Sequence, residues 1–183
     1  GGGGWLDYDG DGWLDLYLVQ GCRLPYDPRS NQDRNQLFRN RADGTFELVT
    51  DAAGVGDNHY GQGIATGDCD NDGFPDFYVS NYGPDLLYHN NGDGTFSEVS
   101  QHSNANCPLY GTSCAWSDLD SDGDLDLYVP NYIEWDAARP PVCRGGASDV
   151  RGYCGAEFFA GQADVLYRND GDGHFSDVTT DAG

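Results

Sequence analysis

DYDGDGWLD, at residues 7–15, recurs as DCDNDGFPD at residues 68–76 and as DLDSDGDLD at residues 118–126. Each copy has the form DxDxDGxxD and is followed by a short run typical of a strand: LYLV at 16–19, FYVS at 77–80 and LYVP at 127–130. Self-similarity at a spacing of a few tens of residues is the sequence signature of repeat architectures. The chain is therefore predicted to be a repeat protein with three units.

A second element follows each acidic segment. It reads QLFRN at 36–40, LLYHN at 86–90 and VLYRN at 165–169, followed by DGTF at 43–46, DGTF at 93–96 and DGHF at 172–175. An Asp-Gly pair between aromatic-bearing runs predicts a hairpin turn, because Gly tolerates a positive φ. A lead-in also repeats, as YGxGxA from Tyr60 and YGxSxA from Tyr110, and no stretch has convincing helical periodicity.

One unit is thus predicted to contain strand, acidic loop, strand, connection, strand, Asp-Gly turn and strand. Four short antiparallel strands in roughly 50 residues match a propeller blade. We expect an all-β fold of β-propeller-type blades at residues 1–58, 59–105 and 106–183. Because propellers generally need at least four blades, neighbouring blades are expected from the same protein or another chain. The glycines at residues 1–4 are poor strand material, so the first blade is expected to start incomplete.

The acidic segments predict calcium sites. Carboxylates at positions one, three and five bring hard oxygens around one point, and Gly at position six permits the sharp turn. The backbone carbonyl of position seven adds a ligand, and Asp at position nine completes the coordination shell of the ion. Oxygen-only sites of high coordination favour calcium over magnesium. About three ions are expected, with these ligands: Asp7, Asp9, Asp11, Trp13, Asp15, Asp68, Asp70, Asp72, Phe74, Asp76, Asp118, Asp120, Asp122, Asp124 and Asp126. The alternative is that these segments are solvated acidic turns.

The connection between the second and third strands varies between units, from residues 81–85 in the second to 21–35 in the first and 133–163 in the third. In an up-and-down blade it lies opposite the acidic loop, and long insertions on one face often carry binding function. Aromatic and arginine residues of the third insertion could form a recognition site: Tyr132, Trp135, Arg144, Arg151, Tyr153, Phe158 and Phe159. The alternative is that the insertion only covers a blade edge or pocket.

The bulk charge and the missing motifs exclude several functions. The chain carries 31 acidic and 9 basic residues, a net charge of -22, which argues against nucleic acid and anionic membranes as partners. There is no apolar run that could span a bilayer, no GxSxG elbow and no P-loop. His89 occupies the slot of Arg39 and Arg168, which indicates a surface substitution. The chain is therefore expected to have no catalysis of its own.

Six cysteines are present, and none forms a CxxC motif. Secreted proteins pair such cysteines. Local pairing favours Cys143–Cys154 and Cys107–Cys114, which leaves Cys22 for Cys69, although six cysteines allow fifteen connectivities. Free thiols in a cytosolic protein are the alternative.

Two sets of aromatic residues recur at fixed blade positions. They are Tyr17, Tyr78 and Tyr128 in the second strand, and Phe46, Phe96 and Phe175 after the Asp-Gly turn. Recurrence in every unit predicts that they pack between blades.

The DxDxDGxxD loop, the LDLYV-like strand and the NGDGTF turn resemble FG-GAP/VCBS repeats, which form integrin-α-like propellers and occur in many secreted bacterial proteins. The YCG segment at 153–155 with ADVLYRN at 163–169 also resembles the insertion of bacterial ASPIC/UnbV-associated proteins. The resemblance implies calcium-stabilised adhesion, ligand binding or assembly, at an extracellular, cell-surface or periplasmic location. It does not imply one shared reaction.

The leading hypothesis is an exported calcium-binding propeller segment that mediates adhesion or assembly of a surface complex or filament. One alternative is a lectin-like module whose insertion aromatics stack on carbohydrate. Another is the propeller portion of a larger secreted enzyme.

Overall fold

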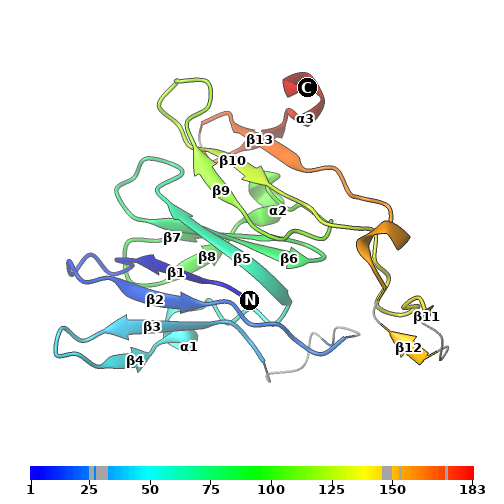
Figure 1. The fold of residues 1–183 in the computed structure, drawn as a ribbon. Coiled ribbons are helices and arrows are strands. Elements are labelled where there is room, and N and C mark those ends of the chain that lie inside the picture. The colour runs from blue at the N-terminus through cyan, green and yellow to red at the C-terminus, as the bar shows by residue number, and fades with distance from the viewer. Residues whose placement is uncertain (25–26, 28–32, 146–149, 153, 172) are drawn as a thin grey trace.

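Three four-stranded antiparallel sheets lie side by side, as Figure 1 shows for the computed structural model. It describes residues 1–24, 27, 33–145, 150–152, 154–171 and 173–183. Blade 1 contains β1 (Gly3–Leu6), β2 (Asp15–Leu18), β3 (Gln36–Asn40) and β4 (Phe46–Leu48). Blade 2 contains β5 (Tyr60–Gly67), β6 (Asp76–Tyr82), β7 (Leu86–Asn90) and β8 (Phe96–Glu98). Blade 3 contains β9 (Ala115–Ser117), β10 (Asp126–Val129), β13 (Val165–Asn169) and β14 (Phe175–Asp177).

Within each sheet the strands are hydrogen-bonded in their order along the chain. The predicted order of strand, acidic loop, strand, connection, strand, turn and strand is confirmed three times. The third-blade insertion adds a separate hairpin, β11 (Cys143–Gly145) with β12 (Val150–Gly152), and a 3-10 turn, η1 (Ala156–Phe158). In Figure 1 the hairpin projects away from the three sheets.

The N-terminal glycines were expected to be poor strand material, and this was wrong for two of them. Gly3 and Gly4 lie in β1, paired with Leu18 and Tyr17. A Cβ at Gly4 would lie 3.0 Å from the Cδ1 of Ile64 on blade 2. The backbone of β1 thus approaches the next blade more closely than a larger residue allows.

A single helical turn follows the fourth strand of every blade: α1 (Thr50–Ala53), α2 (Ser100–Ser103) and α3 (Thr179–Ala182). Each is too short to produce a periodic sequence pattern. The hydroxyl that begins each turn accepts a hydrogen bond from a backbone N–H of the third strand, over 2.9 Å from Leu37, 2.7 Å from Leu87 and 3.0 Å from Leu166. The turn therefore ties the end of the blade back to its middle. None of the described helices has the length and hydropathy needed to cross a bilayer.

Two hydrophobic cores lie between successive blades. In the first, Tyr17 of blade 1 contacts Phe77 of blade 2 with ring centroids 4.6 Å apart, and Phe77 also contacts Tyr88 and Phe96. In the second, Tyr78 and Leu87 of blade 2 pack with Leu127, Val129 and Phe175 of blade 3. Each blade therefore offers a tyrosine-bearing face to the next blade and a phenylalanine-bearing face to the one before.

The expectation that all six recurring aromatics pack between blades was wrong at two positions. Tyr128 is 41% exposed and Phe46 is 44% exposed, whereas Tyr17 and Tyr78 are fully buried. Tyr128 lies on the outward face of blade 3 and Phe46 on the outward face of blade 1, where the described residues supply no covering sheet.

One of the three predicted disulfides is present. Cys143 and Cys154 are bonded, with their Cα atoms 5.2 Å apart. The pairings Cys107–Cys114 and Cys22–Cys69 were wrong, because these four cysteines are free thiols. Cys69 lies in an acidic loop, at the end of its blade opposite the connection that contains Cys22. Cys107 lies beside Asn131, whereas the Sγ of Cys114 points to the carbonyl oxygen of Tyr78, so neighbours in sequence face different partners.

A buried carboxyl group fixes the β6–β7 connection of blade 2 to strand β6. Asp85 is fully buried; it accepts hydrogen bonds from the N–H of Asn81 over 2.6 Å and from the hydroxyl of Tyr78 over 2.9 Å. Burial raises the pKa of Asp85 to about 8, although the two hydrogen bonds act against the rise. In blade 1 the residue at the same position of the repeat is Asn35, whose Oδ1 accepts a hydrogen bond from the N–H of Gln20 over 2.7 Å.

Replacing Phe77 with Ala is expected to lower the free energy of unfolding by about 3–5 kcal/mol, because the ring fills the centre of the first core. Urea titration measures the effect. Phe158→Ala is the matched control: Phe158 is 66% exposed, so its loss should change stability by less than about 0.5 kcal/mol. Equal losses in the two variants would contradict the proposed core.

Asp85 is expected to make stability fall as pH rises. Its pKa of about 8 in the folded protein exceeds the unfolded value of about 3.9, so between these values only the folded protein holds the proton. The Asp85 contribution is greatest below about pH 4 and declines by at most ~1.4 kcal/mol per pH unit up to about pH 8. Asp85→Asn, which copies Asn35, should remove this dependence. Urea titrations between about pH 5 and pH 8, in chelator, should show stability of the variant relative to wild type increasing with pH; a constant difference would refute the assignment.

Candidate functional site

The acidic loops join the first strand of each blade to the second, so all three lie at the same end of their blades. The first aspartate closes each loop. Asp7 accepts the N–H of Asp11 over 3.0 Å and the N–H of Gly12 over 2.9 Å. Asp68 does the same for Asp72 and Gly73, and Asp118 accepts the N–H of Gly123 over 3.2 Å.

The glycine at position six makes the turn possible. Gly12, Gly73 and Gly123 have φ of 86°, 94° and 100°, a region that other residues rarely adopt. The aspartate at position five then accepts the N–H of position seven, over 2.9, 2.8 and 2.9 Å in the three loops. The predicted use of the position-seven carbonyls of Trp13, Phe74 and Asp124 stays a prediction.

The position-nine aspartates have a structural role that the sequence pattern did not predict. Asp15 and Asp76 are completely buried and Asp126 is 4% exposed. Asp15 accepts one N–H from its own loop, that of Tyr8 over 3.1 Å, and one from the third strand, that of Asn40 over 2.7 Å. Asp76 and Asp126 make the same pair of bonds in their blades. Each of these carboxylates therefore fixes the acidic loop to the sheet.

Carboxylate oxygens converge in every loop. The groups Asp7, Asp9 and Asp15, then Asp68, Asp70 and Asp72, then Asp118, Asp120 and Asp122 each place one oxygen per residue within 4.8 Å of the others. Two oxygens bound to one calcium at about 2.3–2.6 Å are at most about 5 Å apart. The three groups are therefore compact enough to share a cation.

Without a counter-ion, ionisation of several aspartates in these loops is unfavourable. Burial raises the pKa of Asp15 and of Asp76. Desolvation and the neighbouring Asp72 raise the pKa of Asp70, and desolvation and Asp122 raise that of Asp120. Each shift shows that the ionised form is disfavoured, which is the condition that a bound cation relieves.

A basic residue on the third strand approaches two of the loops. Arg39 forms ion pairs with Asp9 over 2.6 Å and Asp11 over 3.1 Å. His89 Nδ1 lies 3.1 Å from Asp70 Oδ2 and 3.4 Å from Asp76 Oδ1 with its side chain 31% exposed, so this substitution in the Arg39 slot also lies beside the acidic loop of its blade. Arg168 instead pairs with Asp170 over 2.6 Å. The shared slot on the third strand could have revealed this contact from the sequence.

The residues present fit an oxygen-preferring divalent cation. Besides the clustered carboxylates, the Oδ1 atom of Asp9 is buried and has no hydrogen-bond partner among the described residues. Buried acceptors without partners are uncommon in folded proteins, and an ion is one of their explanations. The loops would hold such an ion through the acidic positions predicted from the sequence.

A row of aromatic side chains crosses the opposite end of the blades. Tyr60 pairs with Tyr82 at the ends of β5 and β6 that lie farthest from the acidic loop. Ring centroids are 6.5 Å apart for Tyr60 and Tyr82, 5.0 Å for Tyr82 and Tyr110, and 5.8 Å for Tyr110 and Tyr132. Tyr60 and Tyr110 of this row begin the lead-in that repeats in the sequence, but the sequence analysis did not predict that these tyrosines contact one another.

Only some of the residues predicted to form a recognition site in the third-blade insertion lie together in the structure. Trp135, Arg151 and Phe159 line one cavity of about 530 Å³, and Tyr132 lines a second cavity of about 240 Å³ with Trp135 and Phe159. Arg144 is exposed on β11, and Phe158 is 66% exposed. Neither lines these cavities, and Tyr153 lies outside the described residues.

A family model described as an FG-GAP-like repeat matches residues 7–79 and 68–129. Each match runs from one acidic loop into the next unit. A search of curated proteins found no match. Because the matched residues end at 129, the ASPIC/UnbV resemblance of the insertion stays a prediction.

Asp15→Asn is expected to destabilise the fold even without a metal. The amide keeps one acceptor oxygen but turns an NH₂ group toward a backbone N–H, which should cost about 1–3 kcal/mol. Urea titration in excess chelator measures this loss. Asp51→Asn is the control, because the Asp51 side chain is 80% exposed and its ion pair with Arg34 is worth less than about 1 kcal/mol. Unchanged stability of Asp15→Asn would contradict its anchoring role.

Proposed function

This chain belongs to the FG-GAP-like repeat family, and we propose that it is a calcium-binding blade segment that mediates adhesion or assembly outside the cell. Repeats of this family are generally structural or binding modules rather than catalysts, and they are typical of extracellular proteins. The observation that carries the proposal is the convergence of carboxylate oxygens in three loops, each closed by the same hydrogen bonds.

Calcium would stabilise the blades by binding only to the closed loops. The ligand positions are spread over nine residues, and position nine is anchored to the third strand. The unfolded chain does not gather these oxygens, so the free energy of binding adds to the free energy of unfolding. The ion would also offset part of the net charge of -22.

Two exposed sheet faces support a role in assembly. The outward face of blade 1 exposes Trp5, Phe46 and Leu48. The outward face of blade 3 exposes Leu119 and Tyr128 beside a cavity of about 320 Å³. These faces correspond to the ones that form the two interblade cores. We propose that they pack against further blades, from the same protein or from another chain.

The Cys143–Cys154 disulfide supports an extracellular or cell-surface location, since disulfides persist mainly in oxidising compartments.

The calcium proposal predicts a large effect of metal on thermal unfolding. Addition of about 10 mM calcium to chelator-treated protein should add roughly 1–3 kcal/mol per site, because extracellular sites have dissociation constants of roughly 0.1–1 mM. Differential scanning calorimetry measures the rise in Tm, and equilibrium dialysis against about 10 mM calcium should find about three bound calcium ions per chain.

Matched variants locate the ions. Asp9→Ala, Asp70→Ala and Asp120→Ala should each remove about one ion, whereas Asp51→Ala, an exposed acidic residue outside the loops, should retain all of them. Wild-type protein without bound metal and without a shift in Tm would refute the proposal.

A further inference from the structure

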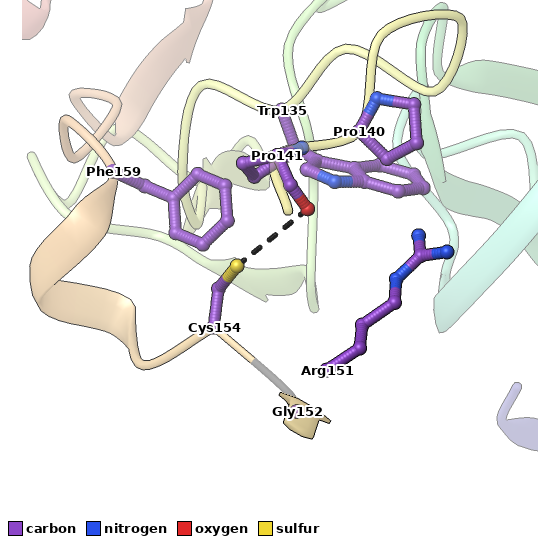
Figure 2. A pocket seen from close by; sticks show the side chains of 7 residues that line it. All are labelled: Trp135, Pro140, Pro141, Arg151, Gly152, Cys154 and Phe159. Carbon is purple, nitrogen blue, oxygen red and sulfur yellow. Dashed lines mark hydrogen bonds between the residues drawn. The ribbon is translucent and has the colours of Figure 1, made fainter. Parts of the chain in front are cut away.

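The larger cavity of the insertion combines flat apolar groups with one cation. Figure 2 shows Phe159 and Arg151 around an open hollow with the Trp135 indole and two prolines, Pro140 and Pro141. The Arg151 side chain extends from β12 toward the indole. A volume of about 530 Å³ is within the range of small-molecule sites, in which apolar walls are combined with a few polar groups.

The walls of this cavity are held in place by the rest of the structure. The hydroxyl of Tyr82 donates a hydrogen bond to the carbonyl oxygen of Trp135 over 2.8 Å, and the two rings are 5.3 Å apart. The Cys143–Cys154 disulfide links the hairpin to the wall that carries Phe159. Cys154 Sγ, which has no hydrogen in the disulfide, packs 3.7 Å from the carbonyl oxygen of Pro141. Such prior ordering lowers the entropy cost of binding.

A second cavity continues the first. Its volume is about 240 Å³, and it shares Trp135, Cys154 and Phe159 with the larger cavity. Its remaining walls include Tyr60, Tyr110 and Tyr132 of the aromatic row. Tyrosine offers both an apolar ring and a hydroxyl, so the combined site suits an elongated ligand that alternates apolar and hydroxyl-bearing surfaces.

The charge distribution limits the ligand further. Three of the nine basic residues of the chain, Arg139, Arg144 and Arg151, fall within the insertion. Arg144 lies directly opposite Arg151 in the β11–β12 ladder, so two of the three arginines lie on one hairpin. The net charge of the whole chain, -22, repels polyanions. A ligand with a single negative group therefore fits this site better than a phosphorylated or highly charged polymer.

We infer that this cavity binds a carbohydrate chain that ends in a sugar with one carboxylate, such as a uronic acid. The carboxylate accepts hydrogen bonds from the planar guanidinium of Arg151, whose donors match it in pairs. The apolar faces of the sugar ring pack against Trp135 and Phe159. The next sugar lies in the second cavity, on the tyrosines.

Isothermal titration calorimetry with the full chain tests this inference, with methyl glucuronide as the probe and methyl glucoside as the uncharged control ligand. The glucuronide should bind at least about tenfold more tightly than the glucoside, because the two differ only at C6, where the glucuronide has a carboxylate and the glucoside a neutral hydroxymethyl group. Arg151→Gln should abolish this preference while leaving glucoside binding unchanged. Trp135→Ala should weaken both sugars by about tenfold or more.

Two variants outside the cavity serve as controls. Arg139→Gln removes the same charge at a position paired with Asp136, and Phe158→Ala removes an exposed ring; both should bind like wild type. Circular dichroism and a thiol count verify that each variant is folded and retains the disulfide. No binding of either sugar by folded wild type, equal binding of the two sugars, or equal effects of Arg139→Gln and Arg151→Gln would overturn the inference. Calcium content is measured in the same samples, so failure here is distinguishable from failure of the calcium proposal.

Discussion

The buried aspartate at position nine of each acidic loop is the constraint on which the rest of the blade depends. Asp15, Asp76 and Asp126 each accept one N–H from the loop and one from the third strand. Because ionised acceptors make strong hydrogen bonds, this bridge sets the position of the loop relative to the sheet. The bridge also brings a negative charge into the protein interior, where a nearby cation would lower its cost. At the proposed calcium sites, metal binding would therefore be coupled to the fold through this carboxyl group.

Each blade has two ends and two faces with different roles. One end gathers the acidic loops, and the other carries the tyrosine row and the insertion cavities, at the two ends of strands such as β5 and β6. The strongly negative charge of the loops is thus kept away from the Arg151 hairpin. The two faces of the sheet are used for stacking, with a tyrosine face against the phenylalanine face of the next blade. Where the described chain provides no next blade, the same residue types are exposed.

Much of the fold could be predicted from the sequence because the signals are local and repeated. The strands, the acidic turns and the Asp-Gly hairpins are each encoded by a few neighbouring residues. Because every motif occurs three times, a chance match is a poor explanation. The pairing of Cys143 with Cys154 is of the same kind, since the two are 11 residues apart, one at the start of the β11–β12 hairpin and the other just after it. The Cys107–Cys114 pair failed because nearness in sequence says nothing about which way a buried side chain points, and the Cys22–Cys69 pair failed because it rested on elimination alone.

The sequence by itself therefore determined that this is an all-β protein of FG-GAP-like repeats with three carboxylate-rich loops. The tertiary structure alone decided that the tyrosines form one row and that Trp135 and Arg151 share a cavity. The physical reason is the range of the interactions. Turn geometry and strand alternation are properties of neighbouring residues, whereas these contacts join side chains from separate strands and loops that meet only in the folded chain.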